Sequence, residues 1–119
     1  MTIALTCPIF THTLSHGQKK FMGVGQLPGI NPETGLPYLH RRIDIEVVQP
    51  DEYPFALLYF TGPGTFNVKL RAHFEEMGYR LNEKSLTDSE GIRYPAHSEA
   101  DIFEMAGVQY LTPQERDQY

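Results

Sequence analysis

The sequence predicts an α+β fold, because segments with strand and helix patterns follow one another without regular alternation. Residues 41–48, RRIDIEVV, alternate apolar and charged side chains, as a strand does when one face packs on a core. Residues 65–77 instead repeat apolar side chains at intervals of four, four and three from Phe66 to Met77, the spacing of one helix face.

The length and composition fit one folded domain, or a part of a larger protein that folds as one unit. Of the 119 residues, 40% are hydrophobic and 21% are charged, which excludes the composition of a disordered chain and that of a membrane protein. The formal net charge of −5 excludes nucleic-acid binding through bulk positive charge. Any contact with DNA must therefore depend on a few placed residues.

The sequence also carries expectations about compartment. A single cysteine, Cys7, excludes an internal disulfide and a cysteine-based zinc site, and we expect its thiol to be buried or inert. No apolar run is long enough to cross a bilayer, and residues 1–10 lack the pattern of a signal peptide. We expect an intracellular protein with no membrane partner.

The first half of the chain is expected to be rich in strands. Residues 1–20 are interpreted as a leader, and residues 21–27, FMGVGQL, as an irregular strand. Residues 28–38 are dense in Pro, Gly and Asn, which predicts a loop, and the strand at 41–48 follows it. Residues 55–60, FALLYF, form a short apolar run between turn residues, which we interpret as a buried strand.

The second half is expected to alternate helices with short strands. Gly78 is placed to end the helix at 65–77, and residues 79–97 are interpreted as short strands with a turn at TDSEG. Ser98 and Asp101 form a capping-box pattern at the start of a helix that Gly107 ends, and Thr112 with Pro113 begins a last short turn.

Three sets of polar residues are candidates for chemistry. Asp44 lies on the polar face of its predicted strand beside Arg42, either as a structural ion pair or as a ligand for a cation. Asn67 and Arg71 are four residues apart on one helix stripe, so both can contact one object. His12 and His16 have a spacing that could bind zinc on a helix, but no third ligand follows them, and we expect no zinc site.

Four segments of the chain resemble family X DNA polymerases. They are KFMGVGQLP, HRRIDIEVV, LYFTGPGTFNVKLRAH and SEADIFEMAGVQYLTPQERD, in that order. From about Thr11 to its end, the chain is similar to the C-terminal part of a DNA polymerase beta-like enzyme. The resemblance implies a partial antiparallel palm sheet in residues 1–58, followed by a small α/β thumb, or nucleotide-selection subdomain, in residues 59–119.

The resemblance also implies an activity. In this family a primer 3′ hydroxyl attacks the α-phosphorus of a dNTP, with two Mg²⁺ ions held on three aspartates. Asp44 resembles the third aspartate, a metal ligand, and Arg42 the catalytic arginine beside the primer phosphate. The implied partners are gapped or primer-template DNA and dNTP, and the implied role is nuclear DNA repair.

Other site residues follow from the same resemblance. Tyr59, Phe60 and Gly62 resemble the turn that packs on the sugar of the incoming nucleotide, and we expect the Gly62–Pro63 peptide bond to be cis. Asn67 resembles the residue that contacts the minor-groove edge of the incoming base. Arg71 resembles the residue that reaches the minor groove of the template strand, where contacts test base-pair geometry rather than sequence.

The family's other two aspartates lie on an Asp-x-Asp strand that does not occur in these 119 residues. The chain therefore offers one of three metal ligands, and we expect it to be inactive without the missing N-terminal palm half. The alternative is a non-catalytic module that binds DNA, nucleotide or a protein partner.

Overall fold

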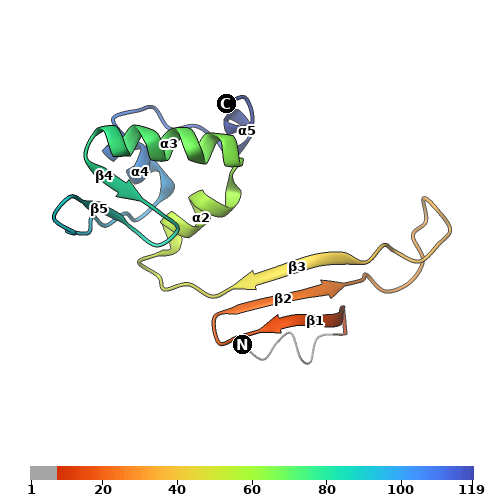
Figure 1. Cartoon of the computed structure of the whole chain (residues 1–119). Helices are drawn as coiled ribbons and strands as arrows, with labels where there is room; N and C mark the ends of the chain where they lie inside the picture. The colour runs from red at the N-terminus through yellow and green to blue at the C-terminus, as the bar shows by residue number, and fades with distance from the viewer. Residues whose placement is uncertain (1–7) are drawn as a thin grey trace. The chain divides into compact units, whose positions relative to one another are not determined.

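The computed structural model describes residues 8–119, and the chain divides into two compact units, one ending at Val47 and the other beginning at Val48 (Figure 1). Helices and small antiparallel sheets confirm the α+β class. The predicted change from palm to thumb at residues 58 and 59 falls inside a helix, whereas the two units separate before that helix begins. Cys7 lies outside the described residues.

The first unit is a three-stranded antiparallel sheet. Its strands are β1 (Phe10–His16), β2 (Lys20–Gly25) and β3 (Arg41–Glu46), in the order β1-β2-β3. The strands predicted within 21–27 and 41–48 are confirmed. The interpretation of residues 1–20 as a leader is wrong for 10–16, because hydrogen bonding to β2 makes these mostly polar residues an edge strand despite their weak apolar pattern.

Two glycines of β2 allow the sheet to pack closely. Phe21 is fully buried, and its ring contacts the rings of Phe10 and His16 edge-on. A Cβ on Gly23 would lie 2.5 Å from the Phe21 ring, and one on Gly25 would lie 2.5 Å from Ile43. Glycine at both positions therefore leaves room for the side chains that form this small core.

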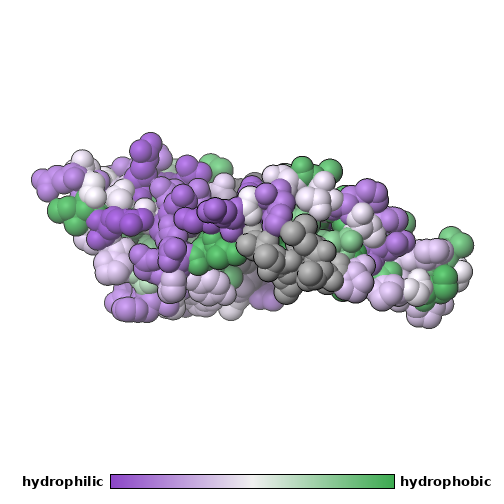
Figure 2. Space-filling view, turned by 90° about the horizontal axis from the view of Figure 1, so that it is seen from below, coloured by the Kyte–Doolittle hydropathy of each residue, from purple (hydrophilic) through white to green (hydrophobic). Residues whose placement is uncertain are grey.

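The connection between β2 and β3 is an ordered loop. Asn31 shapes it, since its Oδ1 accepts from the Glu33 backbone N–H at 2.9 Å and its backbone oxygen accepts from Gly35 N–H at 2.8 Å. Apolar side chains remain exposed along it, and they colour the tip green in Figure 2. They are Leu27, Ile30, Leu36 and Leu39.

The second unit begins with two helices, α2 (Tyr53–Thr61) and α3 (Gly64–Glu76). The strand predicted at 55–60 is wrong, because these residues are the body of α2. A short apolar run does not distinguish a buried strand from a buried helix, and here Pro54 is well placed in the first turn. The helix predicted at 65–77 is confirmed, and Gly78 follows its end with φ +88°.

The rest of the unit closes the core. A hairpin of β4 (Tyr79–Leu81) and β5 (Leu86–Asp88) precedes α4 (Glu99–Ala106) and the short α5 (Pro113–Arg116), as Figure 1 shows. The core side chains come from α2, α3, both strands of the hairpin, α4 and the segment before α4. They are Phe55, Leu58, Phe66, Leu70, Phe74, Leu81, Leu86, Ala96, Ile102, Phe103 and Ala106.

The helix ends follow the predicted signals with one exception. Gly107 ends α4 in the left-handed conformation, as predicted. The Ser98 side chain makes no capping bond, and the Asp101 carboxylate accepts instead from the His97 backbone N–H at 2.8 Å. In the part of the chain that the structure describes, no helix is long and apolar enough to cross a membrane.

Candidate functional site

The candidate metal ligand lies in the middle of β3. Asp44 pairs with Met22 across the ladder to β2, and its side chain lies on the same face of the strand as Arg42. Arg42 Nε donates to Asp44 Oδ1 at 3.0 Å, and each of the two side chains is 50% exposed. Within residues 8–119, β3 is the last strand of its sheet, so this ion pair faces solvent on an edge strand.

This arrangement fits one ligand of a magnesium site. A carboxylate oxygen suits Mg²⁺, which is commonly held by one or two carboxylates together with water and phosphate oxygens. The neighbouring Arg42 guanidinium holds one oxygen of the Asp44 carboxylate in place. However, no cluster of three or more His, Cys, Asp or Glu side chains occurs in the described range, so Asp44 would share a metal only with groups from elsewhere.

His12 and His16, whose spacing could bind zinc only on a helix, lie on the strand β1. Residues four apart on a strand are separated by about 13 Å, which is too far for one metal ion. The His12 ring instead lies 6.0 Å from the His40 ring, and its Nδ1 is 2.9 Å from Thr11 Oγ1.

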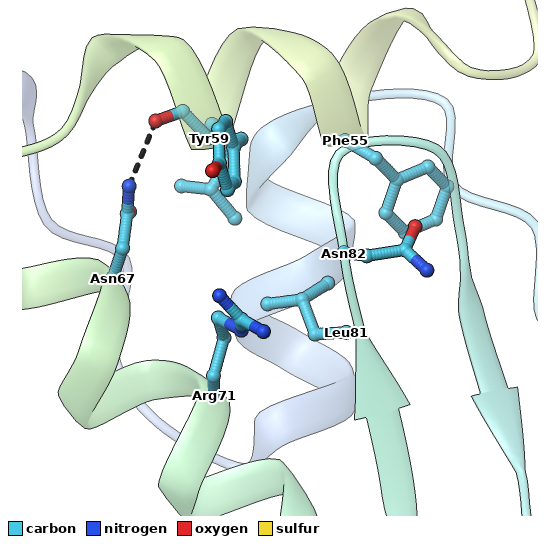
Figure 3. A pocket seen from close by; sticks show the side chains of 7 residues that line it. Phe55, Tyr59, Asn67, Arg71, Leu81 and Asn82 are labelled. Carbon is cyan, nitrogen blue, oxygen red and sulfur yellow. Dashed lines mark hydrogen bonds between the residues drawn. The ribbon is translucent and has the colours of Figure 1, made fainter. Parts of the chain in front are cut away.

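The second unit brings together Tyr59, Asn67 and Arg71. All three line a small hollow between α2, α3 and the start of the β4–β5 turn (Figure 3). Asn67 Nδ2 donates to the Tyr59 backbone oxygen at 2.7 Å, which ties α3 to the C-terminal turn of α2. Figure 3 shows Arg71 extending from α3 toward Leu81 and the same hollow.

The hollow is not a preformed nucleotide pocket. Its cavity volume is about 10 Å³, which is room for at most about one water molecule. Arg71 is exposed, and across residues 8–119 its guanidinium has neither a hydrogen-bond nor an ion-pair partner. A ligand would therefore contact the rim, where Arg71 offers unsatisfied donors.

Phe60 and Gly62 lie beside this hollow rather than in it. The Phe60 ring is exposed and lies edge-on to the Tyr59 ring, with centroids 5.0 Å apart. Gly62 ends α2 with φ +65°, a backbone conformation that favours glycine, and the Gly62–Pro63 bond is cis as expected. The two aromatic side chains thus form an exposed ledge at the end of α2, and the buried Gly62 follows them in the chain.

Four residues that line the hollow were not predicted as site residues: Phe55 and Leu58 of α2, and two residues from the hairpin. Leu81 and Asn82 line it from β4 and the turn that follows. The Asn82 Oδ1 accepts from the backbone N–H groups of Lys84 and Ser85, at 2.8 and 2.9 Å. An asparagine directly after a short strand is a turn signal, but only the fold brings this turn to α3.

Comparisons with known proteins give the chain a family. The sequence profile of the DNA polymerase beta thumb matches residues 56–117. DNA polymerase lambda of Rattus norvegicus is 38% identical over 111 residues, covering 84% of this chain and 18% of the relative. The human DNA-directed DNA/RNA polymerase mu is 40% identical over 78 residues, covering 64% of this chain and 16% of the relative. DNA polymerase lambda of Arabidopsis thaliana is 34% identical over 90 residues, covering 66% of this chain and 17% of the relative. The chain spans less than a fifth of the length of each of these relatives.

Proposed function

The chain belongs to the family X DNA polymerases and contains their beta thumb, and from that premise we propose that it is the C-terminal segment of a DNA repair polymerase. The complete enzyme would transfer dNMP from a dNTP to a primer 3′ hydroxyl, in the nucleus. The observation that carries the proposal is the match of residues 56–117 to the thumb, joined to a strand that presents Asp44 and Arg42 to solvent. We assign residues 1–58 to the palm and residues 59–119 to the thumb.

In this proposal Asp44 is the acidic catalytic residue of the segment. Its carboxylate would hold one of the two Mg²⁺ ions, which when bound supply Lewis-acid stabilisation of the reacting oxygens. Arg42 orients that carboxylate, and it would offer its remaining guanidinium donors to a primer phosphate. The 3.0 Å bond between them supports both roles, because one contact fixes the carboxylate and the arginine together.

The thumb residues would read the nascent base pair. Tyr59 and Phe60 would provide an exposed ledge for the dNTP sugar, with the buried Gly62 in the turn that follows, and Asn67 would contact the base. The Asn67 bond to the Tyr59 backbone oxygen supports this, since it couples the base-contacting residue to the ledge. Arg71, whose donors are unsatisfied in the described residues, would reach the template strand in its minor groove.

A non-catalytic module remains the second candidate for these 119 residues acting alone. The sequence holds no Asp-x-Asp strand, and the described residues hold no cluster of three possible metal ligands, which favours a chain that binds DNA or nucleotide without chemistry. Both candidates agree that the isolated chain does not extend a primer. They differ once an Asp-x-Asp palm half is supplied.

The test is primer extension on gapped DNA with Mg²⁺ and dNTPs. The 119-residue chain would be assayed alone and as a fusion behind the upstream part of rat DNA polymerase lambda, replacing the matching segment of that enzyme. We expect extension from the fusion and none from the chain alone. A fusion that binds gapped DNA but adds no nucleotide would favour the non-catalytic module.

A further inference from the structure

A second, larger cavity lies in the unit that begins at Val48. Its volume is about 400 Å³, and it shares only Phe55 with the hollow that contains Arg71. Its walls come from the residues before α2, from Phe55 of α2, from the β4–β5 turn and from residues 93–97. The size falls in the range of small-molecule sites.

Hydrogen bonds fix the backbone on two of these walls. The Asn82 amide oxygen holds the N–H groups of Lys84 and Ser85, as described above. Arg93 forms a β-bridge with Thr87, and the next backbone N–H, of Tyr94, donates to the Leu86 oxygen at 2.9 Å. The backbone that carries Lys84, Ser85 and Arg93 is therefore held in place before a ligand binds.

The charged groups of the cavity are unpaired. Lys84, Arg93 and His97 line it together with one carboxylate, Asp51. Across residues 8–119, neither Lys84 nor Arg93 makes a hydrogen bond or ion pair through its side chain. In a chain of net charge −5, two free cations beside one carboxylate form a local positive site.

A hydroxyl without a partner among the described residues lines the same cavity. Ser85 is only 9% exposed, and in the described structure its side chain has no hydrogen-bond partner. It lines the cavity together with the two cations, so its hydroxyl is available to a group that occupies the space. A hydroxyl can donate one hydrogen bond to an acceptor such as a phosphate oxygen.

We propose that this cavity binds a phosphate group. The planar guanidinium of Arg93 offers several N–H donors in a geometry that matches phosphate oxygens. Lys84 adds a positive point charge, and Ser85 adds a hydroxyl donor. The remaining walls include Pro50 and Pro95, against which the sugar or base attached to such a phosphate can pack. The site is separate from Arg71, and it stands whether or not the chain takes part in polymerisation.

The experiment is an NMR titration of the ¹⁵N-labelled 119-residue chain with inorganic phosphate, at constant ionic strength and pH 7. We expect saturable shifts of the backbone amides of Lys84, Ser85 and Arg93. Arg93→Gln should weaken binding by about tenfold or more, because it removes a charge-assisted contact. Arg80→Gln is the matched control, since Arg80 is exposed on β4 and lies outside the cavity walls.

The source of the phosphate is tested in further arms with a thymidine oligonucleotide carrying either a 5′ phosphate or a 5′ hydroxyl. Tighter binding of the phosphorylated strand than of inorganic phosphate, lost in Arg93→Gln, assigns the site to nucleic acid; equal binding assigns it to free phosphate. Unsaturable shifts, or shifts equal in wild type and Arg93→Gln, would overturn the proposal. If Arg93→Gln does not fold, Lys84→Gln replaces it, because Lys84 is exposed on a turn.

Discussion

Replacement of Arg116 should destabilise the second unit more than loss of one ordinary contact. This side chain is fully buried at the end of α5, where its Nη1 donates to Glu99 Oε2 at 2.9 Å and its Nε donates to the Leu111 oxygen at 3.0 Å. Its guanidinium carbon lies 5.2 to 5.7 Å from the ring centroids of Phe66, Phe103 and Tyr110. These contacts join α5 to α3 and α4.

The expected loss follows from the charge that remains. In Arg116→Met, Glu99 keeps a carboxylate that is only 12% exposed and has lost its cation, and breaking such a pair costs about 3 to 5 kcal/mol. The double variant Arg116→Met with Glu99→Leu removes both charges. Replacement of a buried pair by apolar groups is often close to neutral, so the double variant should be more stable than Arg116→Met. The Arg116 Nη2 is buried without a partner in the described residues, which costs free energy. The double variant removes this cost as well, which is a further reason to expect it to be close to neutral relative to wild type.

The assay is urea unfolding followed by far-ultraviolet circular dichroism, with the free energy of unfolding compared among the variants. Arg80→Met serves as the control, because an exposed arginine without an ion pair should change the free energy by less than about 0.5 kcal/mol. A loss below about 1 kcal/mol in Arg116→Met, or a double variant less stable than the single one, would show that Glu99 does not depend on Arg116 for compensation of its buried charge.

Three further changes test the fold. The Asp88 carboxylate accepts first from the Ile92 N–H and also from the Tyr94 hydroxyl and other turn N–H groups, which lowers its pKa below the ordinary 3.8. The stabilisation by the Asp88 carboxylate is therefore fully present above its unfolded-state pKa and is lost as the pH falls through the lower folded-state pKa. In urea unfolding at a series of pH values, the difference in free energy of unfolding between wild type and Asp88→Asn should shrink between about pH 5 and pH 2. A difference that stays constant with pH would contradict this assignment. Thr112→Ala removes the side-chain acceptor of the Glu115 N–H and should lower the free energy of unfolding by about 1 kcal/mol in the same assay. Thr61→Ala is its control, because the Thr61 side chain does not cap a helix. Phe74→Ala leaves a hole at a fully buried position and should cost about 3 to 5 kcal/mol or prevent folding, seen as loss of the cooperative transition.

The sequence predicted those elements whose pattern is long or strongly marked. The helix at 65–77 was readable because three buried side chains, Phe66, Leu70 and Phe74, recur at helical spacing over its whole length. The six apolar residues at 55–60 carried no such spacing, since α2 exposes Leu57, Tyr59 and Phe60 as well as burying its other face. Their helical state is decided by packing in the unit, which a single segment does not encode.

The candidate sites divide in the same way. Asn67 and Arg71 could be paired from their spacing, and Arg42 with Asp44 from strand alternation, and the structure brings together both pairs. Asn82 and Leu81 could not be placed at the same hollow, because their approach depends on how the hairpin folds back onto α3. The metal and substrate roles themselves came from family resemblance and remain predictions.

The most direct test of the central claim is the specific activity of the polymerase fusion carrying Asp44→Ala. Loss of one metal ligand removes several kcal/mol of transition-state stabilisation, so we expect kcat/KM for dNTP incorporation to fall by about a thousandfold. Glu33→Ala is the control, because Glu33 is an exposed carboxylate on the loop between β2 and β3 and should leave incorporation unchanged. If Asp44→Ala and Glu33→Ala extend the primer equally well, Asp44 is not the catalytic carboxylate.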